Sequence, residues 1–233
     1  MTNLTPLSGQ IYIHSKQLVA IDCTIFGYEN GNLKLLLFHR KIEPSKGEWS
    51  LPGGWVNDDE SVENAASRVL LQITGLKDIY LEQVHVFSDP ARDPGGRVIS
   101  ILFYALISIA KHDEKLVIEH DAHWWQIDAL PQLIFDHDRM VEKALEKLRF
   151  KASLELTGDK LLPESFTFLH LRKLYNAIFQ REFDPGNFRK KVLSLGTLER
   201  LKIKNTTESK RGAYYYKFKE NMKNSSTDRI VKL

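Results

Sequence analysis

Two acidic residues stand where the chain could do metal chemistry. Glu60 and Glu63 lie at the start of Ser61–Ile73, a segment whose apolar residues recur with helical spacing. Carboxylate oxygens are the ligands that Mg²⁺ prefers, and a bound magnesium ion could neutralise a diphosphate and activate a water. Acidic residues at a helix start also stabilise the helix dipole without any metal. Taken alone, the pair is therefore a weak metal site.

The segment around this helix resembles the Nudix box. The matching residues are Gly54, Glu60, Arg68, Leu70, Gly75 and Leu76. The lead-in at 49–54, the segment 89–97 and Trp125 followed by Leu130-Pro131 are also similar to that family, so the resemblance covers most of residues 18–150. It implies an α/β (α+β) fold, the Nudix α/β/α sandwich with a mixed sheet.

The Nudix box departs from the pattern of active hydrolases where the metal is bound. The resemblance implies glutamates at three positions that here hold Val69, Gln72 and Ile73. Residues with that spacing share one helical face, and valine and isoleucine offer a metal no oxygen. We therefore expect no catalytic residue, no metal, no cofactor and no enzyme activity. The histidines show no spacing typical of a metal site either: His14, His39, His85, His120 and His123.

A Nudix fold without its metal ligands can still keep a pocket that binds a ligand and leaves it intact. Arginines could contact phosphates there, while tryptophans could stack on a sugar that aspartates hydrogen-bond. The candidate effector-binding residues are Arg40, Trp49, Asp89, Arg92, Asp93, Arg97 and Trp124. The alternative is a domain kept as a scaffold, with its aromatic residues in the core.

The last third of the chain differs in charge from the rest. Residues 160–233 hold 17 Lys and Arg against 7 Asp and Glu, a net charge of +10, whereas residues 1–159 carry a net charge of −7. A basic domain beside an acidic one favours a polyanionic partner. A basic surface that only serves solubility is the alternative.

Residues 160–219 resemble the winged helix-turn-helix of Nudix-related transcriptional regulators, the NrtR family. The resemblance is carried by the segments 166–178, 184–191 and 210–218. A helix with Asn, Arg and Lys in its first turns can enter a major groove and read adenine and guanine, while lysines of a wing contact phosphates. The candidate DNA-binding residues are Asn187, Arg189, Lys190, Lys191, Lys202, Lys204, Lys210 and Arg211. A winged helix that binds protein is the alternative.

The elements that must position these residues alternate between strand and helix. Strands are predicted at 19–28, 33–40, 79–87, 97–108, 123–127, 198–204 and 214–218, and helices at 61–73, 138–150, 167–180 and 185–195. Asn30-Gly31 predicts a hairpin turn, and Gly75 and Gly196 predict helix ends. We place a Nudix-like domain at 1–155, a winged-helix domain at 160–222 and a polar tail at 223–233.

The composition favours a cytoplasmic protein. Cys23 is the one cysteine, so no disulfide can form within the chain, and a reducing compartment is expected. Residues 1–10 lack the pattern of a signal peptide. No apolar run approaches the roughly 20 residues that a membrane span needs, so no membrane partner is expected.

Together the two halves predict a DNA-binding transcriptional regulator, a repressor, whose degenerate Nudix domain binds a small-molecule effector. A palindromic double-stranded operator needs a two-fold protein, so a homodimer is expected. The layout is most similar to the AraR-type pentose-responsive regulators of Bacteroidetes, notably at 21–23, 135–137 and 210–213. That similarity favours a sugar such as arabinose or xylose over ADP-ribose as the effector.

Two other functions compete with this interpretation. One is a weak Nudix pyrophosphatase that acts on ADP-ribose-like substrates and carries an accessory basic domain. The other is a binding module whose basic domain contacts RNA or an acidic protein. Sequence preference for one DNA duplex over others would separate a regulator from both.

Overall fold

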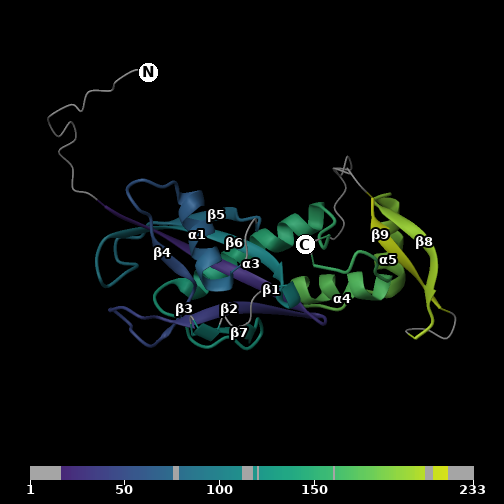
Figure 1. The fold of residues 1–233 in the computed structure, drawn as a ribbon, viewed down its shortest axis with the longest axis horizontal. Helices are drawn as coiled ribbons and strands as arrows, with labels where there is room; N and C mark the ends of the chain where they lie inside the picture. The colour runs from purple at the N-terminus through teal and green to yellow at the C-terminus, as the bar shows by residue number, and fades with distance from the viewer. Residues whose placement is uncertain are drawn as a thin grey trace, which may run out of the picture.

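The computed structural model describes residues 17–75, 79–111, 118–119, 121–159, 161–207 and 212–219. A sheet domain lies at one end of the molecule, and a smaller domain of helices and a hairpin lies at the other (Figure 1). Two expected DNA-binding residues, Lys210 and Arg211, fall outside the described residues, as do Leu76 of the Nudix box and the expected tail. Within the described part of the chain, no helix is both long and apolar enough to cross a membrane.

A mixed seven-stranded sheet forms the centre of the first domain. The elements in chain order are β1 (Leu18–Glu29), β2 (Asn32–His39), β3 (Trp49–Ser50), β4 (Gly53–Trp55), α1 (Val62–Thr74), β5 (Glu82–Phe87), β6 (Val98–Ser108), the 3₁₀ turn η1 (Ile109–Lys111), β7 (Ala122–Gln126) and α3 (His137–Leu154). The strand order is β3-β2-β1-β6-β5, with β4 paired to β1 and β7 paired to β2. Only β1 and β6 run parallel among these pairs, so the predicted mixed sheet is confirmed.

Helices cover both faces of this sheet, because β1 sends alternate side chains to opposite sides. Cys23 and Ile25 are buried in one core with Val69 of α1. Phe26 points into the other core, where Met140 of α3 packs. The three layers are those of the predicted α/β/α sandwich.

Local signals in the sequence fix several of these boundaries. The Ser61 side chain accepts a hydrogen bond from the Asn64 backbone N–H at 3.2 Å and so begins α1. Gly75 ends the helix with a φ of 69°, a left-handed conformation that favours glycine. Asn30 and Gly31 have φ values of 50° and 89°, as the tight hairpin between β1 and β2 requires.

The second domain is a helix-turn-helix followed by a two-stranded hairpin. Its elements are α4 (Phe168–Phe179), α5 (Pro185–Ser194), β8 (Leu198–Asn205) and β9 (Ala213–Phe218). Leu174 and Tyr175 of α4 are buried together with Phe188 of α5. Phe166 exchanges two backbone hydrogen bonds with Tyr216, at 2.9 and 2.7 Å, and thereby ties the start of the domain to the wing strand β9.

The structure differs from the sequence-based boundaries in three places. α3 continues to Leu154, beyond the expected end at Phe150, because Ala152 packs fully buried in the core. β5 begins at Glu82 and not at Ile79. The short strands β3 and β4 were not predicted, since two or three residues are too few to show a periodic pattern.

Candidate effector pocket and nucleic-acid interface

A cavity of about 230 Å³ opens between β1, β4 and the N-terminus of α3. It lies beside the Nudix box, and Gly54 of the box and the preceding Gly53 form part of the cavity wall. Charged and aromatic side chains share the lining and include Asp22, Arg40, Trp55, Arg92, Asp93, Phe135 and His137. This combination suits a small polar ligand that also presents an apolar face.

A network of buried charges forms the floor of the pocket. Arg92 donates through Nε and Nη2 to the two carboxylate oxygens of Asp136, at 3.0 and 2.7 Å. The same Nη2 lies 3.9 Å from Asp22, whose carboxylate accepts a hydrogen bond from Ser100 Oγ at 2.5 Å. Only 3% of the Arg92 side chain is exposed, so one guanidinium is held between two carboxylates away from water.

His137 completes the network as a neutral imidazole. Its Nδ1 accepts the backbone N–H of Leu51 at 3.1 Å, so the proton of the neutral ring is on Nε2. Nε2 lies 3.9 Å from an Asp22 oxygen. Burial lowers the pKa of His137 below its ordinary 6.5, although the nearby Asp22 and Asp136 carboxylates oppose that shift.

The pocket offers both donors and acceptors for hydroxyl groups. The fork of Arg92 already binds Asp136, so an incoming phosphate would compete with a carboxylate for it. Arg40 is held differently, because its Nε donates to the carbonyls of Ile42 and Pro44 while its guanidinium lies 5.2 Å from the centre of the Phe135 ring. A polyol that bonds to charged groups and stacks on an aromatic ring fits this arrangement.

The Nudix helix α1 offers the pocket no metal site. Val69 and Ile73 are 3% and 8% exposed and belong to the core. Glu60 accepts from Arg68 Nε at 3.0 Å and from the Asn57 backbone N–H at 2.9 Å. The Arg68 hydrogen bond holds the pKa of Glu60 below its ordinary value. Within the described residues, no group of acidic side chains on α1 is arranged to hold a metal.

The structure brings three of the seven expected effector residues together in the pocket, namely Arg40, Arg92 and Asp93. The other four lie outside it. Asp89 and Arg97 bond to backbone groups of their own loop, at Ala91 N–H and Ser88 carbonyl. The remaining two are tryptophans of the sheet, Trp49 and Trp124, which pack on opposite faces of it.

Sequence reasoning missed several residues of the pocket, among them Asp22, Trp55, Phe135 and His137. The sequence analysis used segments 21–23 and 135–137 only for their similarity to pentose-responsive regulators and assigned them no role in the pocket. Asp22 interrupts an otherwise buried apolar strand and is itself only 8% exposed. A charged residue inside such a strand is a signal that could have identified the site, because buried charges need partners.

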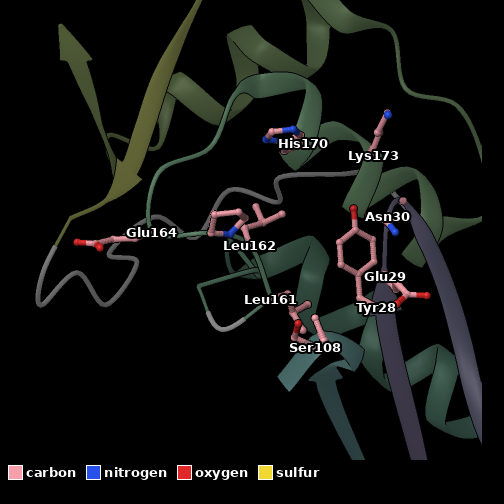
Figure 2. Close-up of a pocket in the computed structure, with 12 residues that line it drawn as sticks. Tyr28, Glu29, Asn30, Ser108, Leu161, Leu162, Glu164, His170 and Lys173 are labelled. Atoms are coloured by element: carbon pink, nitrogen blue, oxygen red, sulfur yellow. The ribbon is translucent and has the colours of Figure 1, made fainter. Parts of the chain in front are cut away.

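A second, larger cavity of about 590 Å³ lies where the two domains meet. Figure 2 shows Tyr28 and Asn30 of the β1–β2 hairpin facing His170 and Lys173 of α4 across it. The linker residue Leu162 contributes to another wall. No residue of the Nudix box lines this cavity.

The fold also gathers two distant histidines that the sequence spacing does not link. His39 ends β2 and His123 lies in β7, and Asp121 stands between them. One ligand atom from each lies within 4.8 Å of the others, an arrangement that could hold a metal ion. Spacing along the chain could not reveal this group, because residues 39 and 123 are far apart in the sequence; the expectation of no metal stays a prediction.

The second helix of the winged domain, α5, begins as predicted. Asp184 caps it by accepting the Asn187 backbone N–H at 2.8 Å, and Pro185 is its first residue. Phe188 and Val192 are buried against the domain. The opposite face of α5 is exposed and presents Asn187 and Lys190 near the helix N-terminus.

Arg189 is turned back onto its own domain. Its Nη2 donates to Tyr216 Oη at 3.0 Å, and its guanidinium lies 5.1 Å from the centre of the Phe168 ring. On the wing, the exposed Lys202 and Lys204 lie on β8, and Lys204 Nζ is 4.7 Å from the Tyr214 ring centre. Arg200, which sequence reasoning did not include, lies over the same ring at 4.7 Å. The half-buried Lys191 is on α5.

Family models match both domains of the chain. The NUDIX domain model matches residues 16–144, and the NrtR DNA-binding winged helix domain model matches residues 158–218. A relative from Acinetobacter baylyi is named "ADPR responsive transcriptional repressor NtrR" and is 30% identical over 205 residues, which cover 86% of this chain and 82% of the relative. An ADP-ribose pyrophosphatase of Methanocaldococcus jannaschii is 37% identical over 134 residues, 57% of this chain and 75% of the relative.

Solved structures of NrtR from Shewanella oneidensis match as well. Its complex with a 27mer DNA has a TM-score of 0.74 and 30% identity, covering 86% of this chain and 93% of that chain. Its isolated NUDIX domain in complex with ADP ribose has a TM-score of 0.51 and 31% identity, covering 60% of this chain and 94% of that chain.

Proposed function

The chain belongs to the NrtR family, in which a Nudix domain is joined to a DNA-binding winged helix, and from that premise we propose a transcriptional repressor that a small-molecule effector releases from DNA. The observation that carries the proposal is the charge network of Arg92, Asp22 and Asp136 beside a Nudix helix that lacks metal carboxylates. Such a pocket can bind a polar ligand without supplying the metal that hydrolysis needs.

We expect no hydrolysis, because Val69 and Ile73 fill core positions with side chains that cannot bind a metal. Likeness to the M. jannaschii pyrophosphatase supports the competing function. Incubation with ADP-ribose and Mg²⁺ at high protein concentration should release no AMP. Magnesium-dependent release that Glu60→Gln abolishes would support the pyrophosphatase instead.

We propose that the pocket takes a pentose ring. ADP-ribose is the first candidate, since the A. baylyi relative is named for its response to it and the Nudix domain of S. oneidensis NrtR was crystallised with it. Free arabinose or xylose is the second candidate, because a cavity of about 230 Å³ is smaller than the roughly 300–1,000 Å³ typical of sites for drug-sized ligands. The likeness to pentose-responsive regulators remains a proposal.

Titration calorimetry with ADP-ribose, arabinose and xylose separates these effectors. Asp93 and Asp89 give a matched pair of variants, since each accepts a backbone N–H two residues further on, at 2.7 and 2.8 Å, but only Asp93 lines the pocket. Asp93→Asn should weaken the effector about 10- to 100-fold, the worth of one hydrogen bond to a charged group. Asp89→Asn should leave affinity unchanged. Equal effects of both variants would place the effector elsewhere.

We propose that α3 carries the effector signal to the winged helix. The pocket residue His137 is its first residue and Asp136 immediately precedes it. Near its other end, Arg149 Nε donates to the Ile178 carbonyl of α4 at 3.0 Å. A shift of α3 on effector binding would therefore move α4. Arg149→Met should preserve effector affinity and reduce DNA release, whereas Arg139→Met, exposed on the same helix, should change neither.

The DNA interface that we propose combines α5 and the wing. Asn187 would face the major groove, and Arg189 would join it by exchanging its hydrogen bond to Tyr216 for one to a base. Lys190, Lys191, Lys202, Lys204, Lys210 and Arg211 would contact phosphates. Two copies would bind a palindromic operator as a homodimer. Sedimentation at working concentration tests the dimer. A preference for the chain's own upstream duplex over a shuffled one, at physiological salt, tests specificity. Equal affinity for both duplexes would favour the RNA- or protein-binding module.

A further inference from the structure

The described part of the molecule contains one cluster of metal-ligating side chains outside the effector pocket. His39, Asp121 and His123 come from the adjacent ends of β2 and β7. His39 Nδ1 lies 3.0 Å from Asp121 Oδ2, and His123 Nε2 lies 3.2 Å from Asp121 Oδ1. Neither the Nudix match nor the winged-helix match gives this cluster a role.

Sheet geometry places the three side chains together. β2 and β7 pair antiparallel with Phe38 opposite Ala122 and Leu37 opposite His123, so the next residues outward, His39 and Asp121, face each other. The His39 and His123 rings lie 5.9 Å apart and each reaches the Asp121 carboxylate, so the three side chains lie on the same face of the sheet. Directly opposed side chains on one face have Cβ atoms about 5 Å apart, close enough to share an ion.

The backbone conformation of Asp121 helps to position its carboxylate. Its φ is 54°, in the left-handed region that few residues other than glycine, asparagine and aspartate adopt. Its backbone N–H donates to the Ile118 carbonyl oxygen at 2.9 Å, which holds the turn in place. The turn thus fixes the carboxylate between the two imidazoles.

Trp49 encloses one side of the cluster. Trp49 of β3 pairs with His39 of β2, and the two rings lie against each other, tilted by 33°, at a centroid distance of 3.8 Å. Its ring also meets the His123 ring edge-on at 5.4 Å. Asp121 and His123 remain about half exposed, with 53% and 52% of their side chains accessible. The cluster is therefore held on one side and open to solvent on the other.

We propose that His39, Asp121 and His123 form a zinc-binding site. Two imidazole nitrogens and a carboxylate oxygen are ligands that Zn²⁺ accepts, and tetrahedral bonds of about 2.0 Å place ligand atoms roughly 3.3 Å apart. The two imidazoles lie 3.0 and 3.2 Å from different oxygens of Asp121, and one ligand atom from each residue lies within 4.8 Å of the others, so small side-chain rotations bring all three to that spacing. Three protein ligands leave a fourth position for water or for a group from another molecule.

A metal ion at this site would link the ends of β2 and β7 next to the effector pocket. The following residue in the chain, Arg40, lines that pocket. A metal ion joining β2 to β7 would therefore stiffen the strand end from which Arg40 extends. The zinc site does not depend on the identity of the effector, and its failure would leave the proposed regulator intact.

Zinc binding by the full chain, free of any affinity tag, tests the site. We expect one Zn²⁺ per chain by titration calorimetry, and a visible absorption band of tetrahedral geometry when Co²⁺ replaces it. The double variant His39→Gln/His123→Gln should lose both signals. His85→Gln, a change of an exposed histidine on β5, is the matched control and should keep them.

A milder variant guards against loss of the fold. Asp121→Asn removes the charge but suits the left-handed turn, so tryptophan fluorescence should stay native while zinc affinity falls at least about tenfold. No zinc bound by the parent chain would overturn the proposal. Unchanged zinc affinity and stoichiometry in the double variant or in Asp121→Asn would overturn it too.

Discussion

Removing the charge of Arg92 should destabilise the Nudix domain strongly. Arg92→Met keeps most of the side-chain volume but removes the buried positive charge that Asp136 and Asp22 share. Asp136 also loses two hydrogen bonds. Deleting one member of a buried ion pair costs about 3–5 kcal/mol, because the remaining charge stays away from water. With a urea m-value near 2 kcal/mol per molar, the unfolding midpoint should fall by about 1.5–2.5 M.

The tryptophans make this unfolding easy to follow. All four lie between residues 49 and 125, so their fluorescence reports the Nudix domain and not the winged helix. Arg97→Met is the matched control, since Arg97 lies in the same region of the chain, is exposed and donates one hydrogen bond, to the Ser88 carbonyl at 2.7 Å. It should cost less than about 1 kcal/mol. Equal midpoints for the two variants would refute the buried network.

The double variant Arg92→Met/Asp136→Leu refines the same test. It removes the stranded carboxylate together with the arginine, and replacing both members of a buried pair by apolar groups is often nearly neutral. We therefore expect it to recover part of the stability lost in Arg92→Met. If the losses in unfolding free energy of Arg92→Met and Asp136→Leu simply add in the double variant, the two residues act independently and the buried network is contradicted.

Three further expectations concern DNA reading, pH and packing. Asn187→Ala should lower discrimination between operator and shuffled duplex by about 1–3 kcal/mol in anisotropy titrations, while Lys190→Ala should weaken both duplexes alike and reduce the salt slope by about one. Burial lowers the pKa of His137 from 6.5, so on acidification the unfolded chain protonates this histidine before the folded chain does. The free energy of unfolding should therefore be fully retained above pH 6.5 and fall below it by up to about 1.4 kcal/mol per pH unit. The urea midpoint of His137→Gln should not show this pH dependence. Gly53→Ala should cost about 1–3 kcal/mol in the same unfolding assay, because the added Cβ would lie 2.7 Å from the Ile21 carbonyl oxygen and closer still to Asp22.

Much of the fold could be predicted because its signals are local. Ser61 and Gly75 bound α1, Asn30-Gly31 forms the hairpin turn, and Asp184 with Pro185 starts α5, each through contacts within a few residues. The mixed sheet and the winged helix were expected from the resemblance to the Nudix and NrtR families and were confirmed. The end of α3 was missed because tertiary packing of Ala152, and not a capping residue, extends that helix.

The sites were harder to predict because they assemble residues from distant parts of the chain. Asp22 of β1 meets Arg92 of a loop and His137 of α3 only after the sheet forms. His39 and Asp121 likewise meet through strand pairing that no sequence spacing reveals. The orientation of Arg189 depends on Tyr216 in the following hairpin, so its place on α5 alone gives no direction for its side chain.

Release of operator DNA by the effector tests the central claim most directly. A fluorescent duplex from the chain's own upstream region is bound by the 233-residue chain at physiological salt, and ADP-ribose, arabinose or xylose is then added. We expect one of them to lower the anisotropy to that of free DNA, with Asp93→Asn requiring about 10- to 100-fold more of the same ligand and Asp89→Asn requiring no more. Specific binding that none of the three ligands changes, or release that is insensitive to Asp93→Asn, would contradict the account.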